Sequence, residues 1–356
     1  MKPGGLVSPV NQTIPDVRYR HRAMAVWLLV LCAMVFAMVV LGGVTRLTHS
    51  GLSMVEWRPA TGWLPPLNEA EWEDVFAKYR QFPEYMKINA TMSLPEFKAI
   101  YRLEFLHRLW GRLIGVAFIV PFAFFAVKGW VDRRLAAKLA IMFVLGGLQG
   151  ALGWYMVKSG LADRPDVSQY RLTAHLGAAL VIYGYMLWVA LGLLFPGPPP
   201  QGEGLSGRLA LPAAGVAVLI FVTALSGGFV AGLDAGLIYN TFPLMDGQLV
   251  PDGLFSMEPP YLNVFEDIMT VQFDHRVLAV AVVAAVAALW LGAPKASLAP
   301  RARLALDLLA LATAVQAALG VSTLLLVVPV FLAATHQAGA VVVFSAALWT
   351  VHELRA

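Results

Sequence analysis

The chain has 356 residues, of which 59% are hydrophobic and only 13% are charged, and its formal net charge is +4. A mean hydropathy of +0.69 exceeds what a soluble domain of this size needs, so the composition excludes an ordinary soluble protein and favours a membrane protein. The pI of about 9.2 does not indicate a nucleic-acid partner, because the basic residues lie beside apolar segments, where membrane topology places them.

Apolar segments long enough to cross a bilayer follow one another along the whole chain. We expect strands to be missing, because these runs are too long and lack a period of two. The predicted fold is an all-α polytopic membrane protein with eight transmembrane helices. The predicted helices lie at about 24–44, 104–127, 136–157, 171–195, 208–232, 270–293, 303–326 and 331–351.

The distribution of charge predicts the orientation. Lysines and arginines precede the first helix and fill the connections after the second and sixth helices, so these segments and both termini are expected in the cytoplasm. The segment 233–269 contains no Lys or Arg and is acidic, which places it outside. The first helix is expected to be retained, and no mitochondrial presequence is evident, so a bacterial inner membrane is the expected location. Cys32 is the single cysteine and cannot form an intrachain disulfide.

The two halves of the chain repeat one design in parallel. Gly42-Gly43 recurs as Gly227-Gly228 at the end of the first helix of each half, and Gln149 to Gly153 recurs as Gln316 to Gly320. We expect two parallel-repeat four-helix bundles related by an axis along the membrane normal. The predicted division is a cytoplasmic N-terminal segment 1–23, an N-terminal half 24–195 with a long outer loop 45–103, a linker 196–207, a C-terminal half 208–352 and a cytoplasmic tail 353–356. Within the outer loop, the stretch from Asn68 to Tyr79 predicts a short amphipathic helix.

Four histidines occupy matching places in the repeat, near the outer end of the second and fourth helix of each half: His107, His175, His275 and His336. An imidazole in hydrocarbon is costly and is therefore expected to be functional. A single membrane histidine is more often a satisfied packing residue, but four at equivalent places favour ligation. Two imidazoles meeting across one macrocycle are a common axial set for haem iron.

Zinc or copper is the alternative metal for these histidines, although the pairs lack the Cys, Met or carboxylate partners that zinc and copper sites recruit. We expect His49 not to ligate, and His21 and His352 to face the cytoplasm without a role.

One difference between the halves indicates chemistry. Glu104 lies three residues before His107, on nearly the same helix face, and the matching residue before His275 is the neutral Gln272. A site that moves protons needs an ionisable group, so we expect catalysis in the first half and a resident redox cofactor in the second. Arg108 and Arg276 are candidates for binding haem propionates, with snorkelling to the interface as the alternative.

These motifs together resemble the haem A synthase family. The resemblance rests on Glu104-x-x-His107-Arg108, on Phe273-x-His275-Arg276 and on the later histidine of each half. The long first outer loop, with Gly51-Leu52-Ser53-Met54 and Trp57-Arg58-Pro59, is similar to the branch found in alphaproteobacteria and mitochondria. Some bacterial members have a cysteine pair in this loop, which this chain lacks, so no redox role for such a pair carries over.

The resemblance implies an enzyme that oxidises the C8 methyl of haem O to a formyl group by successive hydroxylations. It implies that His275 and His336 bind a haem b cofactor, that His107 and His175 receive the substrate haem, and that Glu104 is the essential carboxylate. The implied partners are the haem O synthase, a farnesyltransferase, and cytochrome oxidase assembly factors. The electron-transfer partner and a homo-oligomeric state are left open. The alternatives are a di-haem membrane cytochrome that relays electrons without substrate chemistry, and a transporter or haem chaperone.

Overall fold

The structure is a computed structural model that describes residues 14–58, 61–161, 167–197, 205–294 and 298–355. In these ranges the regular secondary structure is helical, with one isolated bridge between Met245 and Gln248 in place of any strand. Eight of the described helices are long and apolar enough to cross a membrane, which confirms the predicted fold class. They are α1 (Ile14–Leu47), α4 (Leu94–Val127), α5 (Arg133–Gly160), α6 (Gln169–Leu194), α7 (Leu205–Gly232), α9 (Ile268–Gly292), α10 (Pro300–Leu325) and α11 (Val330–Leu354).

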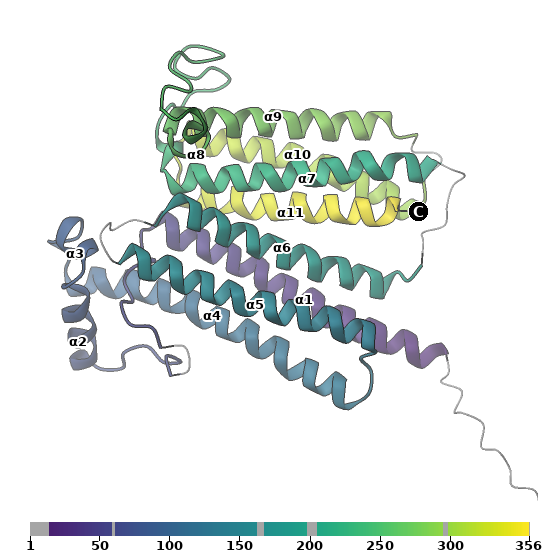
Figure 1. The fold of residues 1–356 in the computed structure, drawn as a ribbon, viewed down its shortest axis with the longest axis horizontal. Coiled ribbons are helices and arrows are strands. Elements are labelled where there is room, and N and C mark those ends of the chain that lie inside the picture. The colour runs from purple at the N-terminus through teal and green to yellow at the C-terminus, as the bar shows by residue number, and fades with distance from the viewer. Residues whose placement is uncertain (1–13, 59–60, 162–166, 198–204, 295–297, 356) are drawn as a thin grey trace, which may run out of the picture.

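The arrangement of these helices fits the predicted repeat. Figure 1 shows α1, α4, α5 and α6 in one group and α7, α9, α10 and α11 in the other, with the long axes of both groups roughly aligned. The groups meet where α1 and α6 pack against α7 and α11. One apolar core runs through both groups, and the Tyr183 hydroxyl on α6 lies 2.7 Å from the Ser345 hydroxyl on α11. The halves are therefore joined through their first and fourth helices.

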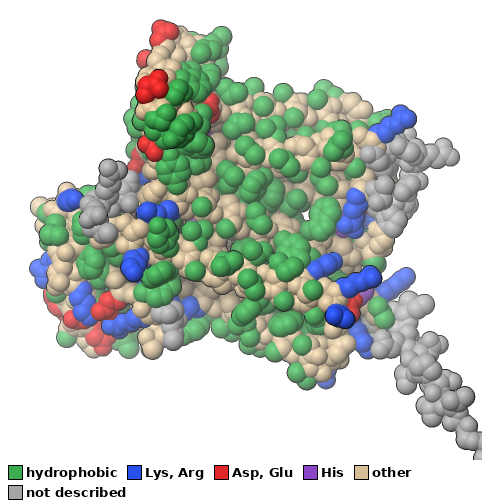
Figure 2. Space-filling view, viewed as in Figure 1, with side chains coloured by type: hydrophobic (Ala, Val, Ile, Leu, Met, Phe, Trp, Pro, Cys, Tyr) green, Lys and Arg blue, Asp and Glu red, His purple; other side chains and the backbone are tan. Residues whose placement is uncertain are grey.

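Two caps cover the same end of the helix groups (Figure 1). The first contains α2 (Glu69–Tyr79) and α3 (Pro83–Lys87), and the second contains η1 (Ala235–Leu237), η2 (Pro260–Leu262) and α8 (Asn263–Glu266). The predicted amphipathic helix is confirmed as α2, whose N-cap Asn68 accepts a hydrogen bond from the backbone N–H of Glu71. Figure 2 shows apolar side chains along the flank of the helices and charged side chains gathered toward the two ends, as a bilayer requires.

The helix α4 begins earlier than predicted, at Leu94, so the outer loop is shorter than 45–103. A capping box between Ser93 and Glu96 starts the helix, and Phe97 and Tyr101 on its first turns pack against aromatic residues of α2 and α3. Hydropathy alone misses this start, because aromatic packing outside the bilayer stabilises the first turns. The helix α1 also begins before residue 24, and residues 1–13 of the predicted N-terminal segment lie outside the described residues, as does 198–204 of the predicted linker.

At the opposite end of α11 lies His352, which the sequence predicted to face the cytoplasm without a role, and its side chain is buried. Its side chain is 2% exposed, and its ring lies 5.3 Å from that of Trp188 on α6. The neighbouring Glu353 is also buried and pairs with Arg301 at 3.2 Å. The helix therefore continues into the predicted tail 353–356, held by contacts with α6 and α10.

Candidate functional site

The structure brings the four predicted histidines together in two pairs. His107 on α4 and His175 on α6 lie close enough for charges on their rings to interact, and so do His275 on α9 and His336 on α11. In the part of the chain that is described, the two helices that carry a pair pack more closely against their flanking helices than against each other. In the first half α1 and α5 flank them, and in the second half α7 and α10 do so. Each pair therefore faces across the interior of its own half.

Each histidine ring lies against a glycine of a flanking helix. A Cβ atom added to Gly42 on α1 would lie 3.1 Å from Cε1 of His107, and one added to Gly227 on α7 would lie 3.2 Å from Cε1 of His275. These separations are shorter than the 3.5–4.0 Å at which carbon atoms pack well. The glycines thus let the rings lie close to the neighbouring backbone.

The fourth-helix histidines have the same arrangement. A Cβ at Gly153 on α5 would lie 3.0 Å from Cε1 of His175, and one at Gly320 on α10 would lie 2.8 Å from Cε1 of His336. One turn earlier on each of these helices, Gln149 and Gln316 donate from Nε2 to the backbone carbonyl of the facing histidine, both at 2.9 Å. The sequence repeat contained these residues, but their role as cradles for the rings was not predicted.

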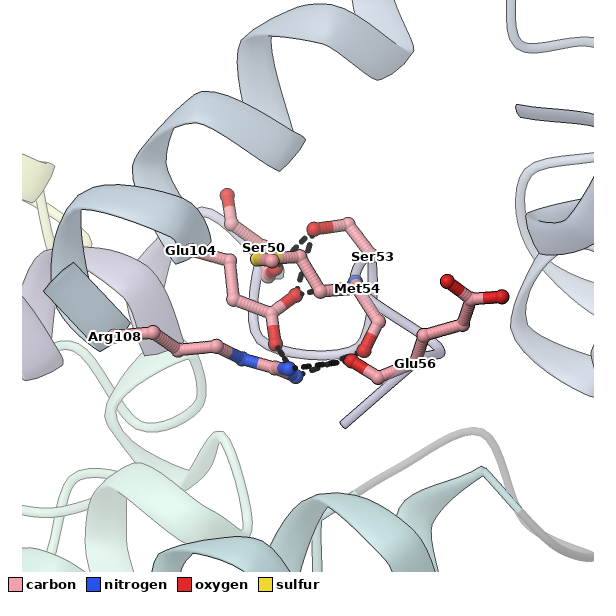
Figure 3. A network of polar contacts seen from close by, with 6 residues as sticks. All are labelled: Ser50, Ser53, Met54, Glu56, Glu104 and Arg108. Carbon is pink, nitrogen blue, oxygen red and sulfur yellow. Dashed lines mark hydrogen bonds and ion pairs between the residues drawn. The ribbon is translucent and has the colours of Figure 1, made fainter. Parts of the chain in front are cut away.

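The carboxylate of Glu104 is buried, and three donors surround it. Its Oε2 accepts from the Ser53 hydroxyl and from the backbone N–H of Met54, both at 2.7 Å, and its Oε1 pairs with Arg108 one turn along α4. Arg108 also donates to the backbone carbonyls of Met54, at 2.8 Å, and Glu56, at 3.1 Å. Figure 3 shows both side chains reaching from α4 to the loop that follows α1. The Glu104–Arg108 pair therefore fastens this loop beside His107.

In the second half, the residue that matches Glu104 holds its loop with the opposite hydrogen-bond polarity. Gln272 donates from Nε2 to the backbone carbonyls of Ala235, at 2.7 Å, and Ile238, and its Oε1 accepts from Arg276 at 3.0 Å. A carboxylate only accepts, whereas an amide also donates. The first loop offers donors to Glu104, whereas the second offers carbonyls to Gln272. The Glu-to-Gln difference therefore also matches a difference in how each loop is held.

The two arginines proposed for propionate binding already form hydrogen bonds to oxygens of the protein. Arg276 donates from Nη1 to Thr241 and Leu244 carbonyls and from Nη2 to Tyr239 and Gln272 oxygens. Its Nε is the buried nitrogen that has no partner in the described structure. The propionate role stays a prediction. In this structure the Nε–H of Arg276 is left to donate to a propionate, because Nη1 and Nη2 already donate to protein oxygens.

Just after α1, His49 is exposed, and its Nδ1 lies 3.4 Å from Arg46. Arg46 also forms an ion pair with Asp234 at 3.0 Å, which joins the ends of α1 and α7 across the two halves. In the first cap, Glu84 on α3 is 5% exposed, and burial raises the pKa of this carboxyl to about 7. Glu84 was not predicted as a functional residue, because it lies in a helix of five residues that is too short to show a periodic pattern.

Comparison with known proteins places the chain in a family. Residues 25–348 match the COX15-CtaA family model, described as cytochrome oxidase assembly protein. The chain is 56% identical to the haem A synthase of Nitrosospira multiformis over 94% of both chains, and 53% identical to that of Parvibaculum lavamentivorans over 98% of this chain and 99% of the relative. It is 49% identical to the haem A synthase COX15 of Bos taurus, over 94% of this chain and 83% of the relative. The chain therefore belongs to the COX15-CtaA family of cytochrome oxidase assembly proteins.

Proposed function

We propose that this protein is a haem A synthase, an enzyme that oxidises the C8 methyl of haem O to the formyl group of haem A. The support is twofold: relatives of that name cover nearly the whole chain, and paired imidazoles face the interior of each half. The pairing of histidines in both halves is the observation that carries the proposal, because a substrate haem and a resident haem would each use one such pair.

The residues present fit a haem in each half. Two imidazoles in each half would supply two nitrogen donors to the iron, and the described residues contain no cluster of three His, Cys, Asp or Glu side chains of the kind that zinc or copper recruits. The glycine behind each ring allows an approach that a Cβ would obstruct. We assign haem b to His275 and His336, where it would supply electron exchange at its iron, and the substrate haem to His107 and His175.

Glu104 is proposed as the catalytic carboxylate. When water supplies the oxygen, each hydroxylation of the methyl releases two protons and two electrons, and loss of water from the resulting diol gives the formyl group. Glu104 lies one turn from His107 on α4 and would accept such a proton at Oε1 or Oε2, or orient the attacking water. Arg108 and the Ser53 hydroxyl hold this carboxylate in place.

The caps and the membrane determine what reaches the sites. The Glu104–Arg108 and Gln272–Arg276 pairs hold the loops over the outer ends of their halves, which limits access of water to the macrocycles. The farnesyl-type tail of haem O suits the apolar helix faces of a multi-pass protein. We propose a bacterial inner membrane, both termini in the cytoplasm and the histidines near the periplasmic side. The haem O synthase and oxidase assembly factors are the proposed partners.

The test is expression of the chain together with a haem O–forming farnesyltransferase in a host that makes no haem A. Extraction of pigments from the purified protein is expected to yield haem A and haem O beside haem B. Haem B alone, in two copies per chain, would instead indicate an electron relay, and a protein without haem would rule out both functions. A Glu104→Gln variant with wild-type conversion would remove the catalytic role of this carboxylate while leaving the activity assignment intact.

A further inference from the structure

The two histidine pairs differ in what their second ring nitrogens contact. In the first half, Nδ1 of His107 and Nδ1 of His175 are buried and have no hydrogen-bond partner in the described structure. In the second half, Nδ1 of His275 lies 2.7 Å from the Ser226 hydroxyl, and Nδ1 of His336 lies 3.1 Å from the Gln316 amide. The halves are alike in their cradles of glycine but unlike in this contact.

The contact at Ser226 fixes the protonation of His275. The Ser226 hydroxyl donates its one proton to the Thr223 carbonyl at 2.8 Å, so its oxygen is left to accept from Nδ1. The proton of His275 therefore sits on Nδ1, and the lone pair of Nε2 is free for iron.

His336 has a similar support from the neighbouring helix. The Nε2 of Gln316 donates to the backbone carbonyl of His336 at 2.9 Å and lies 3.1 Å from the ring Nδ1. Both ligands of the second half are thus oriented by α7 or α10.

The sequence repeat explains why the first half lacks the Ser226 contact. Gly42 and Gly227 hold equivalent positions behind His107 and His275, so the residue before Gly42, Leu41, is the counterpart of Ser226. A leucine side chain can neither accept nor donate a hydrogen bond. The ring of His107 is therefore cradled sterically but is not held by a polar partner.

A hydrogen bond from the distal nitrogen orients a ligating imidazole and increases its basicity, and loss of such a partner commonly costs 10- to 100-fold in metal affinity. Such a hydrogen bond suits a resident cofactor, which must stay bound. It does not suit a site that must release its product after each turnover.

We propose that Ser226 is a positioning residue that makes the second-half haem site retentive, and that Leu41 at the matching place keeps the first-half site exchangeable. The proposal rests on the proposed function in its assignment of resident and substrate haem. The part of the proposal that concerns how tightly each half binds any haem does not depend on that function.

The experiment uses the full-length protein in detergent, loaded with haem B in both halves as the probe. Haem loss to excess apomyoglobin is followed by absorbance, and the reduction potential of the retained haem is measured by redox titration. Wild type is expected to show a fast and a slow phase of haem loss. Ser226→Ala is expected to accelerate the slow phase by about 10-fold or more and to raise the potential, because a less basic imidazole stabilises ferric iron less.

Two further variants separate ligand positioning from general packing. Ser226→Thr restores a hydroxyl and is expected to recover the slow phase and the potential. Ser345→Ala is the matched control, because it removes a half-buried helix serine that contacts Tyr183 rather than a histidine, and it is expected to leave both readouts unchanged. An unchanged potential and slow phase in Ser226→Ala would overturn the proposal, and so would equal effects of Ser226→Ala and Ser345→Ala.

The reciprocal change tests the first half and remains informative if Ser226→Ala fails to fold. Leu41→Ser is expected to slow the fast phase, whereas Leu41→Ala, which leaves a similar space without a hydroxyl, is not. Identical fast phases in the two Leu41 variants would contradict the proposal. If co-expression yields no haem A but these phases shift as expected, the proposed function fails and the assignment of a retentive and an exchangeable site stands.

Discussion

Replacing Gly153 with alanine is expected to weaken haem binding in the first half by about 5- to 150-fold. The added Cβ would lie 3.0 Å from Cε1 of His175, whereas carbon atoms pack at about 3.5–4.0 Å, so the ring must withdraw by roughly 0.5–1 Å. Forcing an extra carbon into a packed site costs about 1–3 kcal/mol, and each 1.4 kcal/mol corresponds to a factor of ten in the dissociation constant.

The same helix offers a matched control. Gly147 on α5 has no atom within 4 Å of an added Cβ, so Gly147→Ala changes helix propensity without touching a histidine. Alanine in place of glycine within a helix stabilises by about 0.5–1 kcal/mol. Gly147→Ala is therefore expected to bind haem as wild type does and to be slightly more stable.

Both substitutions are made in a His336→Ala background, so that the Soret absorbance in a haem titration reports the first half. The quantity compared is the dissociation constant of each variant for haem B in the same detergent. If Gly153→Ala binds as tightly as Gly147→Ala, the close approach of His175 to α5 has no role in haem binding and the reasoning fails.

Three other predictions follow from the hydrogen bonds and the buried carboxylates. Ser53→Ala removes one donor to Glu104 and is expected to destabilise the loop by about 1.5–3 kcal/mol while retaining most conversion of haem O. Glu104→Gln is expected to lower the rate of conversion by at least about 100-fold. Equal losses of conversion in the two variants, with equal loop exposure by limited proteolysis, would mean that Glu104 only anchors the loop. Arg276→Lys cannot satisfy the carbonyls that the guanidinium bonds, so faster proteolysis of the second loop is expected, and an unchanged cleavage rate would contradict this. Burial raises the pKa of Glu84 from 4.5 to about 7, so the folded state is penalised as its carboxyl ionises. The stability gain of Glu84→Gln over wild type is therefore expected to be small below about pH 4.5, to grow up to about pH 7 and to level off above; thermal unfolding that shows a constant difference across this range would refute the assignment.

The membrane fold was predictable because its determinants are local. In hydrocarbon every backbone polar group must be bonded within the segment, so a long apolar run is sufficient to predict a helix. The start of α4 at Leu94 was not predictable in this way, because its first turns are stabilised by the Ser93–Glu96 capping box and by aromatic side chains of α2 and α3. Packing between aromatic side chains also explains why α3 was not predicted, because Tyr85 packs against Phe76 and Tyr79 of α2.

The sequence by itself determined the membrane class, the repeat and the four histidines, since an imidazole at a matching place in each apolar repeat has a high cost and few uses. Only the tertiary structure decided which atoms those imidazoles and the acidic residue contact. Ser226 reaches His275, and Ser53 reaches Glu104, across helices and loops about 50 residues apart in the chain. A hydrogen bond forms or fails over a few tenths of an ångström, and that precision arises from packing between segments rather than from the order of residues within one.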